Sequence, residues 1–324
     1  MPDRILIVTP APAGSRGGNR ITAERWARLL RTSGYRVGVA GEYRGQPCDV
    51  LVALHARKSA ASIARFHRAQ PDKPLVVVLT GTDLYRDLSH SAAAGRSLER
   101  ATRLVVLQPD AIPYLPPAVR PKTRVIVQSA EGARRAVRPD ESVFVVCVSG
   151  HLRAVKDPFR AALAARLLPG ESRIRVTHIG RPLTDAMRRR AEAEARRNPR
   201  YRWLGEVPHG RARAILARSR LLVLSSRLEG GANVVSEALA LGVPVLSSRV
   251  SGSVGLLGDG YPGFFPVGGT RELAGLLWRC ETDAAFYADL KDRCGQLAWL
   301  IDPARERQAW CELLGELAAV SEAP

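Results

Sequence analysis

The feature that most constrains the fold is a regular alternation of short, uniformly apolar runs with longer stretches rich in Ala, Leu and Arg. Runs that are apolar at every position are typical of central strands in a parallel sheet covered on both faces. In the first half these runs are Ile5–Thr9, Arg36–Ala40, Val50–Leu54, Leu75–Leu79, Leu104–Leu107 and Val125–Val127, and the expected helices are Thr22–Ser33, Ala60–Ala69 and Ser91–Ala101. The alternation predicts a doubly wound α/β fold.

The alternation stops once and then starts again. The segment Glu131–Ser142 is polar, rich in Arg and contains Pro139. Beyond it we expect strands at Val143–Val148, Arg173–Ile179, Leu221–Leu224 and Val243–Ser247, with helices at Pro158–Leu168, Asp185–Arg197, Arg211–Ala217 and Val234–Leu241. The sequence therefore predicts two Rossmann-like domains, residues 1–140 and 141–324. The closing stretch Asp283–Val320 is almost entirely helical and could pack back across the first domain.

The apolar runs and the cysteines indicate the cellular compartment that we expect for this protein. No apolar run reaches the roughly 20 residues that span a bilayer, and the apolar run near the N-terminus is too short for a secretory signal. The five cysteines are scattered and lack C-x-x-C spacing, which fits a reducing cytosol. We therefore expect a cytoplasmic protein without a membrane partner, and no motif in the sequence indicates a cofactor.

The formal net charge of +18 admits nucleic acid, anionic membrane or small polyanionic ligands. The arginines are spread over the whole chain, and few aromatic residues lie among them. The densest cluster, Arg188–Arg190 with Arg196 and Arg197, has helical periodicity and is typical of a solvated helix face. We expect phosphate-rich small ligands rather than nucleic acid. A basic nucleic-acid-binding protein remains an alternative, which steeply salt-dependent binding to any duplex would favour.

The loop after the first apolar run is suited to an anion. Ligands of open α/β sheets bind beyond the carboxyl ends of the strands. Here Gly17 and Gly18 let backbone amides approach a phosphate at the start of a helix, beside Asn19 and Arg20. The loop is neither a G-x-G-x-x-G fingerprint nor a P-loop, so a plain flexible loop is an equal alternative.

The most specific feature is the segment Glu229-Gly-Gly-Ala-Asn-Val-Val-Ser-Glu237, which follows the run at Leu221–Leu224. Its glycines expose amides to a phosphate, and the helix that starts near Asn233 adds its dipole. Glu237, inside that helix, could accept hydrogen bonds from ribose hydroxyls, and Glu229 could do the same for a sugar. The alternative is a helix N-terminus that is merely enriched in acidic residues.

A pair of cations lies in the segment that follows the first run of the second half, Ser149-Gly-His-Leu-Arg-Ala-Val-Lys156. Arg153 and Lys156 could clamp a departing pyrophosphate. No Asp-x-Asp occurs anywhere in the chain, so there is no obvious carboxylate pair for a metal ion. We expect a metal-independent mechanism.

Taken in order, these motifs resemble the GT-B glycosyltransferases of family 4. The order is Gly150-His-Leu-x-x-x-Lys156, Trp203-Leu-Gly-Glu-Val, Glu-x7-Glu and Leu241-Gly-Val-Pro-Val, and the resemblance covers nearly the whole chain. It implies two Rossmann-like domains facing each other across a cleft, with a UDP-sugar bound to the second. By this resemblance the catalytic and donor-binding residues are Lys156, Arg153, Glu229, Gly230, Gly231, Ala232, Asn233, Glu237 and His151.

The chain departs from this pattern at two positions. The family often has Arg where this chain has His151, so Arg153 supplies the expected charge. A histidine that is common before the Gly-Thr of the first domain is replaced by Thr80. This second difference argues against a usual sugar hydroxyl as the acceptor.

Four further segments resemble the selenosugar synthases of selenoneine biosynthesis. They are Gly18-Asn-Arg-Ile-Thr22, Ala53-Leu-His-Ala-Arg-Lys-Ser59, Leu79-Thr-Gly-Thr-Asp-Leu-Tyr-Arg86 and Ser226-Arg-Leu-Glu-Gly-Gly-Ala-Asn233. That resemblance implies selenophosphate as the acceptor, joined through selenium to the anomeric carbon of a UDP-sugar of the UDP-GlcNAc or UDP-glucose type. The acceptor residues would be Gly17, Gly18, Asn19, Arg20, His55, Arg57, Thr80, Gly81, Thr82 and Asp83.

Two points stay open at the level of the sequence. The acceptor could instead be a hydroxyl of a lipid, a glycan or a small metabolite. His55 could reach the ligand, even as a general base, or be a hydrogen-bonded core histidine, and the residues do not distinguish these roles.

Overall fold

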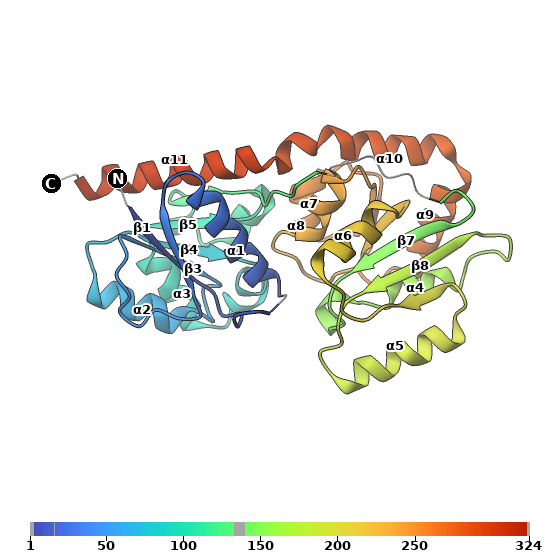
Figure 1. Cartoon of the computed structure of the whole chain (residues 1–324), viewed down its shortest axis with the longest axis horizontal. Helices are drawn as coiled ribbons and strands as arrows, with labels where there is room; N and C mark the ends of the chain where they lie inside the picture. The colour runs from blue at the N-terminus through green and yellow to red at the C-terminus, as the bar shows by residue number, and fades with distance from the viewer. Residues whose placement is uncertain (1–2, 16, 133–139, 323–324) are drawn as a thin grey trace. The chain divides into compact units, whose positions relative to one another are not determined.

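The computed structural model describes residues 3–15, 17–132 and 140–322, which form two compact units (Figure 1). The first unit comprises Met1–Ser129, Glu229–Gly231 and Asp302–Pro324, and the second comprises Ala130–Leu228 and Ala232–Ile301. The division at residue 129 comes earlier than the expected boundary at 140, and the closing helix joins the first unit. Residues 133–139, the greater part of the expected linker, lie outside the described residues.

The first sheet is parallel throughout, with the order β2-β1-β3-β4-β5-β6. Its strands are β1 (Arg4–Val8), β2 (Arg36–Ala40), β3 (Val50–Leu54), β4 (Leu75–Leu79), β5 (Arg103–Val106) and β6 (Thr123–Val125). In the register, Ile7 of β1 pairs with Val52 of β3. From β1 the chain adds β2 on one side and then β3 to β6 in order on the other side, as expected of a doubly wound sheet.

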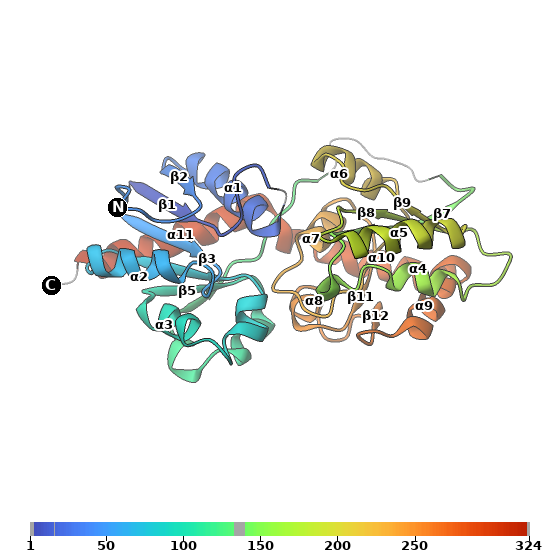
Figure 2. The same ribbon diagram turned by 90° about the horizontal axis from the view of Figure 1, so that it is seen from below.

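Helices cover both faces of this sheet, which explains why its central strands are apolar at every position. Alternate residues such as Leu51 and Ala53 face α2 (Ala60–Ala69) and α3 (Ala92–Arg100). The intervening Val50 and Val52 face the opposite way. There they pack with α1 (Gly18–Arg31) and α11 (Pro303–Glu322), which Figure 2 shows on one side of the sheet.

The closing helix α11 is attached to α1 by a buried carboxylate. Glu306 accepts hydrogen bonds from Trp26 Nε1 at 2.6 Å and from the Ser129 amide at 3.0 Å, and it pairs with Arg25 at 3.1 Å. Beside it, the Trp26 and Trp310 rings meet edge to face at 4.7 Å. The expected return of the C-terminal helix to the first domain is confirmed for Asp302 onward.

The second sheet repeats the parallel pattern in the order β12-β11-β10-β7-β8-β9. Its strands are β7 (Phe144–Ser149), β8 (Ile174–Ile179), β9 (Tyr201–Trp203), β10 (Leu221–Leu224), β11 (Val245–Ser248) and β12 (Phe264–Phe265). Its helices are α4 (Arg160–Ala165), α5 (Asp185–Arg197), α6 (His209–Ala217), α7 (Asn233–Ala240), α8 (Ser251–Leu257), α9 (Thr270–Thr282) and α10 (Ala284–Gln296). The sequence pattern did not predict β9 and β12, because two or three residues are too short for a periodicity to appear.

Short helical turns complete the fold. They are η1 (Asp83–Asp87), η2 (Pro109–Tyr114), η3 (Pro117–Val119), η4 (Ala154–Lys156) and η5 (Ala298–Ile301). Of these, η1 is a single π-helical turn, a form often found at functional sites. In the described part of the chain, no helix combines the length and the apolar character needed to cross a membrane.

Candidate functional site

The turn that carries Lys156 is held from two sides. Arg153 is exposed and precedes η4, Lys156 ends η4, and Asp157 adopts a left-handed backbone conformation at φ 42°. The Asp157 carboxylate pairs with Arg160 at 2.8 Å, and its carbonyl accepts from Ser225 Oγ at 2.9 Å. The Arg227 amide donates to the Val155 carbonyl at 2.8 Å. The turn after β7 is therefore fastened to the loop after β10.

The backbone that precedes His151 is positioned by β8. Gly180 has φ 152°, and a Cβ there would lie 2.0 Å from the Gly150 carbonyl oxygen, so only glycine allows this approach. The buried His178 donates from Nε2 to the same carbonyl at 3.3 Å and accepts from Tyr201 Oη at 2.8 Å. Burial lowers the pKa of His178 to about 4, so the ring is neutral and acts as a structural bridge.

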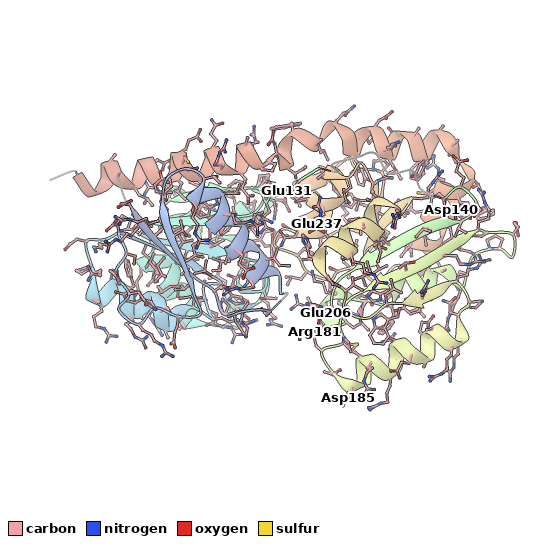
Figure 3. All side chains as sticks on the ribbon, in the orientation of Figure 1. Glu131, Asp140, Arg181, Asp185, Glu206 and Glu237 are labelled. Atoms are coloured by element: carbon pink, nitrogen blue, oxygen red, sulfur yellow. The ribbon has the colours of Figure 1, made fainter. Side chains whose placement is uncertain are left out.

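The segment Glu229–Glu237 leads from a buried loop into α7. Glu229 is buried, Ala232 is the N-cap without a side-chain cap, and α7 begins at Asn233. Glu237 lies inside α7 as expected (Figure 3), with its side chain 17% exposed. The segment therefore supplies both backbone amides at a helix start and an accessible carboxylate.

His209 contacts Glu237, a pairing that the sequence did not indicate. Its Nε2 lies 2.8 Å from Glu237 Oε1. Because 28 residues separate the two and His209 lies in a polar stretch, no local pattern connects them. Arg181 and Glu206 lie on the loops after β8 and β9 in the same unit (Figure 3). Loops at the carboxyl ends of strands are where ligands of such sheets bind.

In the first unit, α1 begins earlier than the sequence suggested, at Gly18 rather than near Thr22. Gly17 is therefore the N-cap, without a side-chain cap, and Asn19 and Arg20 lie in the first turn. Arg20 Nε contacts Glu24 Oε1 at 2.6 Å, one turn along the helix. Because no side chain caps the start of α1, its first-turn amides remain suited to an anion. The Arg20 charge is already partly balanced by a partner that the i, i+4 spacing could have revealed.

The Asp83 carboxylate is hydrogen-bonded to the backbone around it. Its buried carboxylate accepts hydrogen bonds from the amides of Thr80 at 2.9 Å, Gly81 at 2.8 Å and Ala56 at 3.0 Å. A buried carboxylate must be satisfied, and these amides are the donors that satisfy it. The Thr80 and Gly81 amides are consequently turned toward Asp83.

His55 is a hydrogen-bonded core residue. Its backbone has φ 74°, and its side chain is buried. The Lys58 amide donates to Nδ1 at 3.3 Å, so the ring proton lies on Nε2, which donates to Thr82 Oγ1 at 3.0 Å. Burial lowers the pKa of His55, and Asp83 only partly offsets this. Both nitrogens of the neutral ring are therefore engaged in hydrogen bonds.

Arg57 is paired as well. Its Nε donates to Asp87 Oδ2 at 2.7 Å. Burial raises the pKa of Asp87, but hydrogen bonds from Arg57 and Arg86 outweigh burial and leave the pKa below its ordinary value. Asp87 therefore stays ionised and ties the loop after β3 to η1.

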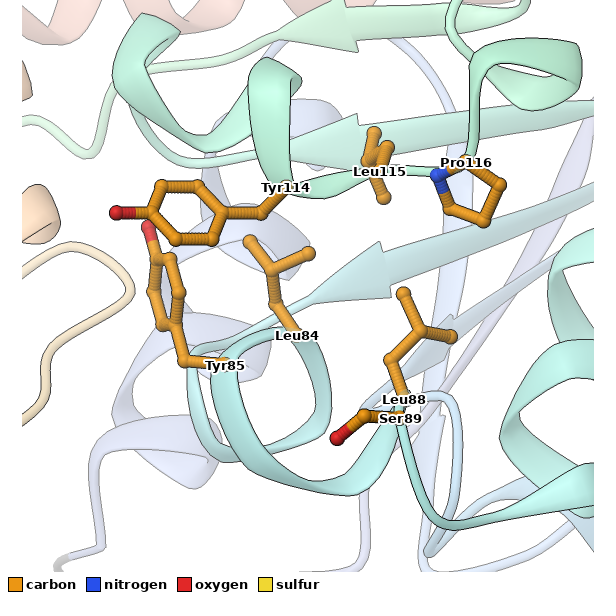
Figure 4. Close-up of a pocket in the computed structure, with 7 residues that line it drawn as sticks. All are labelled: Leu84, Tyr85, Leu88, Ser89, Tyr114, Leu115 and Pro116. Carbon is orange, nitrogen blue, oxygen red and sulfur yellow. The ribbon is translucent and has the colours of Figure 1, made fainter.

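An apolar hollow of about 430 Å³ lies between η1 and η2 (Figure 4). It is lined by Leu84, Tyr85, Leu88, Ser89, Tyr114, Leu115 and Pro116. The rings of Tyr85 and Tyr114 meet edge to face at 4.9 Å. A lining without charged side chains is unsuited to phosphate. Among the described residues, no group of three or more His, Cys, Asp or Glu side chains is arranged to hold a metal ion.

Solved structures share this architecture. The chain is similar to HepE from Anabaena, solved in complex with UDP, with 17% identity and a TM-score of 0.76 over 97% of this chain and 99% of that one. It is also similar to sucrose-phosphate synthase from Thermosynechococcus elongatus, with 16% identity and a TM-score of 0.78 over 98% and 99%. Identities this low establish the fold alone, which is GT-B.

The family is established by a separate match. Residues 129–293 match the model of the family described as "Glycosyl transferases group 1", a segment that spans just over half of the chain and contains η4, α6 and α7. With the motifs and the fold in agreement, this chain belongs to the group 1 glycosyltransferase family.

Proposed function

We propose that this protein transfers the sugar of a UDP-sugar, of the UDP-GlcNAc or UDP-glucose type, to selenophosphate. The observation that carries the donor half is the fastening of the Lys156 turn to the loop after β10, which leads into the Glu229–Glu237 segment. The UDP and UDP-glucose complexes of the similar HepE support the same donor. The donor is assigned to residues 141–324 and the acceptor to residues 1–140, and the setting is cytoplasmic.

In this proposal the donor is held without a metal ion. Lys156 and Arg153 bind the diphosphate, with His151 beside them. The amides around Gly230, Gly231, Ala232 and Asn233 face the donor, and Glu229 binds the sugar. Glu237 accepts hydrogen bonds from the ribose. As UDP departs, the negative charge on its β-phosphate grows, and the cations stabilise that charge.

The acceptor half draws support from the hydrogen bonds of three titratable side chains among the described residues of the first unit. A hydroxyl acceptor would have to lose a proton, yet the nitrogens of His55 are engaged and the carboxylates of Asp83 and Asp87 are committed to amides and arginines. Selenium in ionised selenophosphate is already nucleophilic and needs no such base. The amides of Gly18 and Asn19, with Arg20, would bind its phosphate oxygens.

The proposed reaction has two steps. A selenium lone pair forms the bond to the anomeric carbon, and the bond from that carbon to the UDP oxygen breaks with its electron pair leaving on UDP. Water then attacks phosphorus, and the P–Se electron pair stays on selenium. The products are a 1-selenosugar, UDP and phosphate.

The apolar hollow at Tyr85 and Tyr114 favours a second candidate acceptor (Figure 4). Tyr114 is 54% exposed, and an accessible tyrosine ring packs against the apolar face of a sugar or against other apolar groups. A glycan, lipid or metabolite hydroxyl is therefore the alternative acceptor, on the same donor site.

Mass spectrometry of reaction products tests the acceptor. The enzyme is incubated with UDP-glucose or UDP-GlcNAc, with and without selenophosphate, and with candidate hydroxyl acceptors in its place. We expect UDP release and a selenium-containing sugar only with selenophosphate. Transfer to a hydroxyl acceptor, with selenophosphate unconsumed, would replace the acceptor and leave the donor assignment intact.

Glu237→Ala tests the donor site by calorimetry with UDP. Losing a charged acceptor for the ribose hydroxyls should weaken binding by about 1.5–3 kcal/mol. Glu192→Gln changes a carboxylate on α5 whose side chain is 40% exposed; this control should bind as the wild type does. Equal UDP affinity in all three proteins would remove Glu237 from the donor site.

A further inference from the structure

We infer that His209 is a positioning residue of the donor site, which orients the Glu237 carboxylate toward the ribose hydroxyls. This inference rests on the proposed function, because it presupposes a nucleoside diphosphate beside Glu237. It adds a residue that none of the sequence motifs contains.

The contact is direct and joins two helices. His209 is the first residue of α6, just after Pro208 with φ −55°, and its Nε2 meets Glu237 Oε1 on α7 at 2.8 Å. The pyrrolidine ring of Pro208 fixes its own φ and so limits the backbone freedom just before His209. The side chain therefore starts from a defined point and reaches an acceptor on the neighbouring helix.

The His209–Glu237 pair contributes little to the stability of the fold. The His209 side chain is 55% exposed and that of Glu237 is 17% exposed. Pairs with this much exposure contribute about 0–1 kcal/mol to folding. The main physical effect of the contact is on orientation, because it restricts the rotation of a long and otherwise mobile side chain.

The two oxygens of the Glu237 carboxylate have different roles in this inference. Oε1 takes the imidazole, whereas Oε2 has no protein hydrogen bond in the described part of the chain. Ribose hydroxyls are donors, and a preoriented carboxylate oxygen binds them more tightly than one that must first be ordered. A loss of His209 should therefore weaken the recognition of ribose and leave recognition of the diphosphate intact.

The test compares UDP with 2′-deoxy-UDP as ligands in calorimetry. Wild-type protein should prefer UDP by about tenfold or more, the effect of one hydrogen bond to a charged group. His209→Ala should reduce this preference to about threefold or less, mainly by weakening UDP, and His209→Gln should restore part of it, because the Gln amide can still donate. Arg211→Ala removes an exposed charge from the same helix and should keep the wild-type preference.

The ratio of the two affinities decides the inference, and binding to the wild-type protein decides the proposed function. A merely structural role of His209 would weaken both ligands equally and leave their ratio unchanged, which would overturn the inference. A wild-type preference that persists in His209→Ala would overturn it as well. If the wild-type protein bound neither ligand, the proposed function would fail before this inference was reached.

Discussion

Among single residues, Lys156 depends on its surroundings for its position. It ends a three-residue turn that is held through Asp157, Arg160 and Ser225. In the proposed mechanism a cation on such a fixed turn needs little reorganisation when charge develops on the leaving group, and preorganised groups act mainly on the transition state.

Lys156→Ala should therefore lower kcat far more than it weakens UDP binding. We expect kcat to fall by about a hundredfold or more, with the dissociation constant for UDP rising by less than about tenfold. Steady-state kinetics and calorimetry on the same preparations measure the two effects. Lys156→Arg, which keeps the charge, should recover part of kcat, and an equal loss of binding and turnover would contradict the assigned role.

His178 links the stability of the second unit to pH. The folded protein keeps the ring neutral down to about pH 4, whereas the unfolded chain protonates it near pH 6.5. The unfolded state therefore binds more protons between these values, and the free energy of unfolding falls as the pH drops through this window, by at most about 3 kcal/mol.

Thermal unfolding at several pH values measures this dependence. His178→Asn should flatten the decline between pH 6.5 and 4, whatever it does to stability at neutral pH. His67→Gln, an exposed histidine on α2, should leave the wild-type slope unchanged. A mutant slope equal to that of the wild type would show that another group governs the decline.

For the elements, the attachment of α11 offers a matched pair of variants. Trp26 and Trp310 are both fully buried and touch each other. Trp26 donates to the Glu306 carboxylate, whereas Trp310 Nε1 has no hydrogen-bond partner among the described residues. Trp26→Phe should destabilise the protein by about 1.5–3 kcal/mol more than Trp310→Phe, since it removes a donor to a buried charge. Chemical denaturation measures the difference, and equal losses would mean that Glu306 finds another donor.

Helices and strands could be told apart where the sequence pattern was long and regular. The residues at which they begin and end were predicted less well. The strands Val50–Leu54 and Leu75–Leu79 and the helix Asp185–Arg197 have the predicted bounds. Glycine lowers the local helix propensity, so the sequence predicted that the helix starts near Thr22. In the structure α1 starts at Gly18, because packing of Trp26 and Leu30 on the sheet stabilises the whole helix.

The whole molecule is expected to work without a metal ion, with cations and helix amides facing the diphosphate. Transfer activity should therefore persist after exhaustive treatment with EDTA and dialysis into metal-free buffer. The measurement is the rate of UDP release before and after chelation, with magnesium and manganese added back. Loss of activity in EDTA that either ion restores would falsify the metal-independent mechanism.

The sequence by itself determined the two parallel α/β halves, because uniformly apolar strands and amphipathic helices are set by local composition and period. It also located the loops at the strand ends, where the Lys156 turn and the Glu229–Glu237 segment lie. Only the tertiary structure decided which side chains these loops leave available. Arg20, Arg57, His55 and Asp83 are engaged by neighbours, and His209 reaches Glu237, because hydrogen-bond partners are chosen by distance in space. The same reason assigns Asp302–Pro324 to the first unit, where Glu306 finds the buried donors that its charge requires.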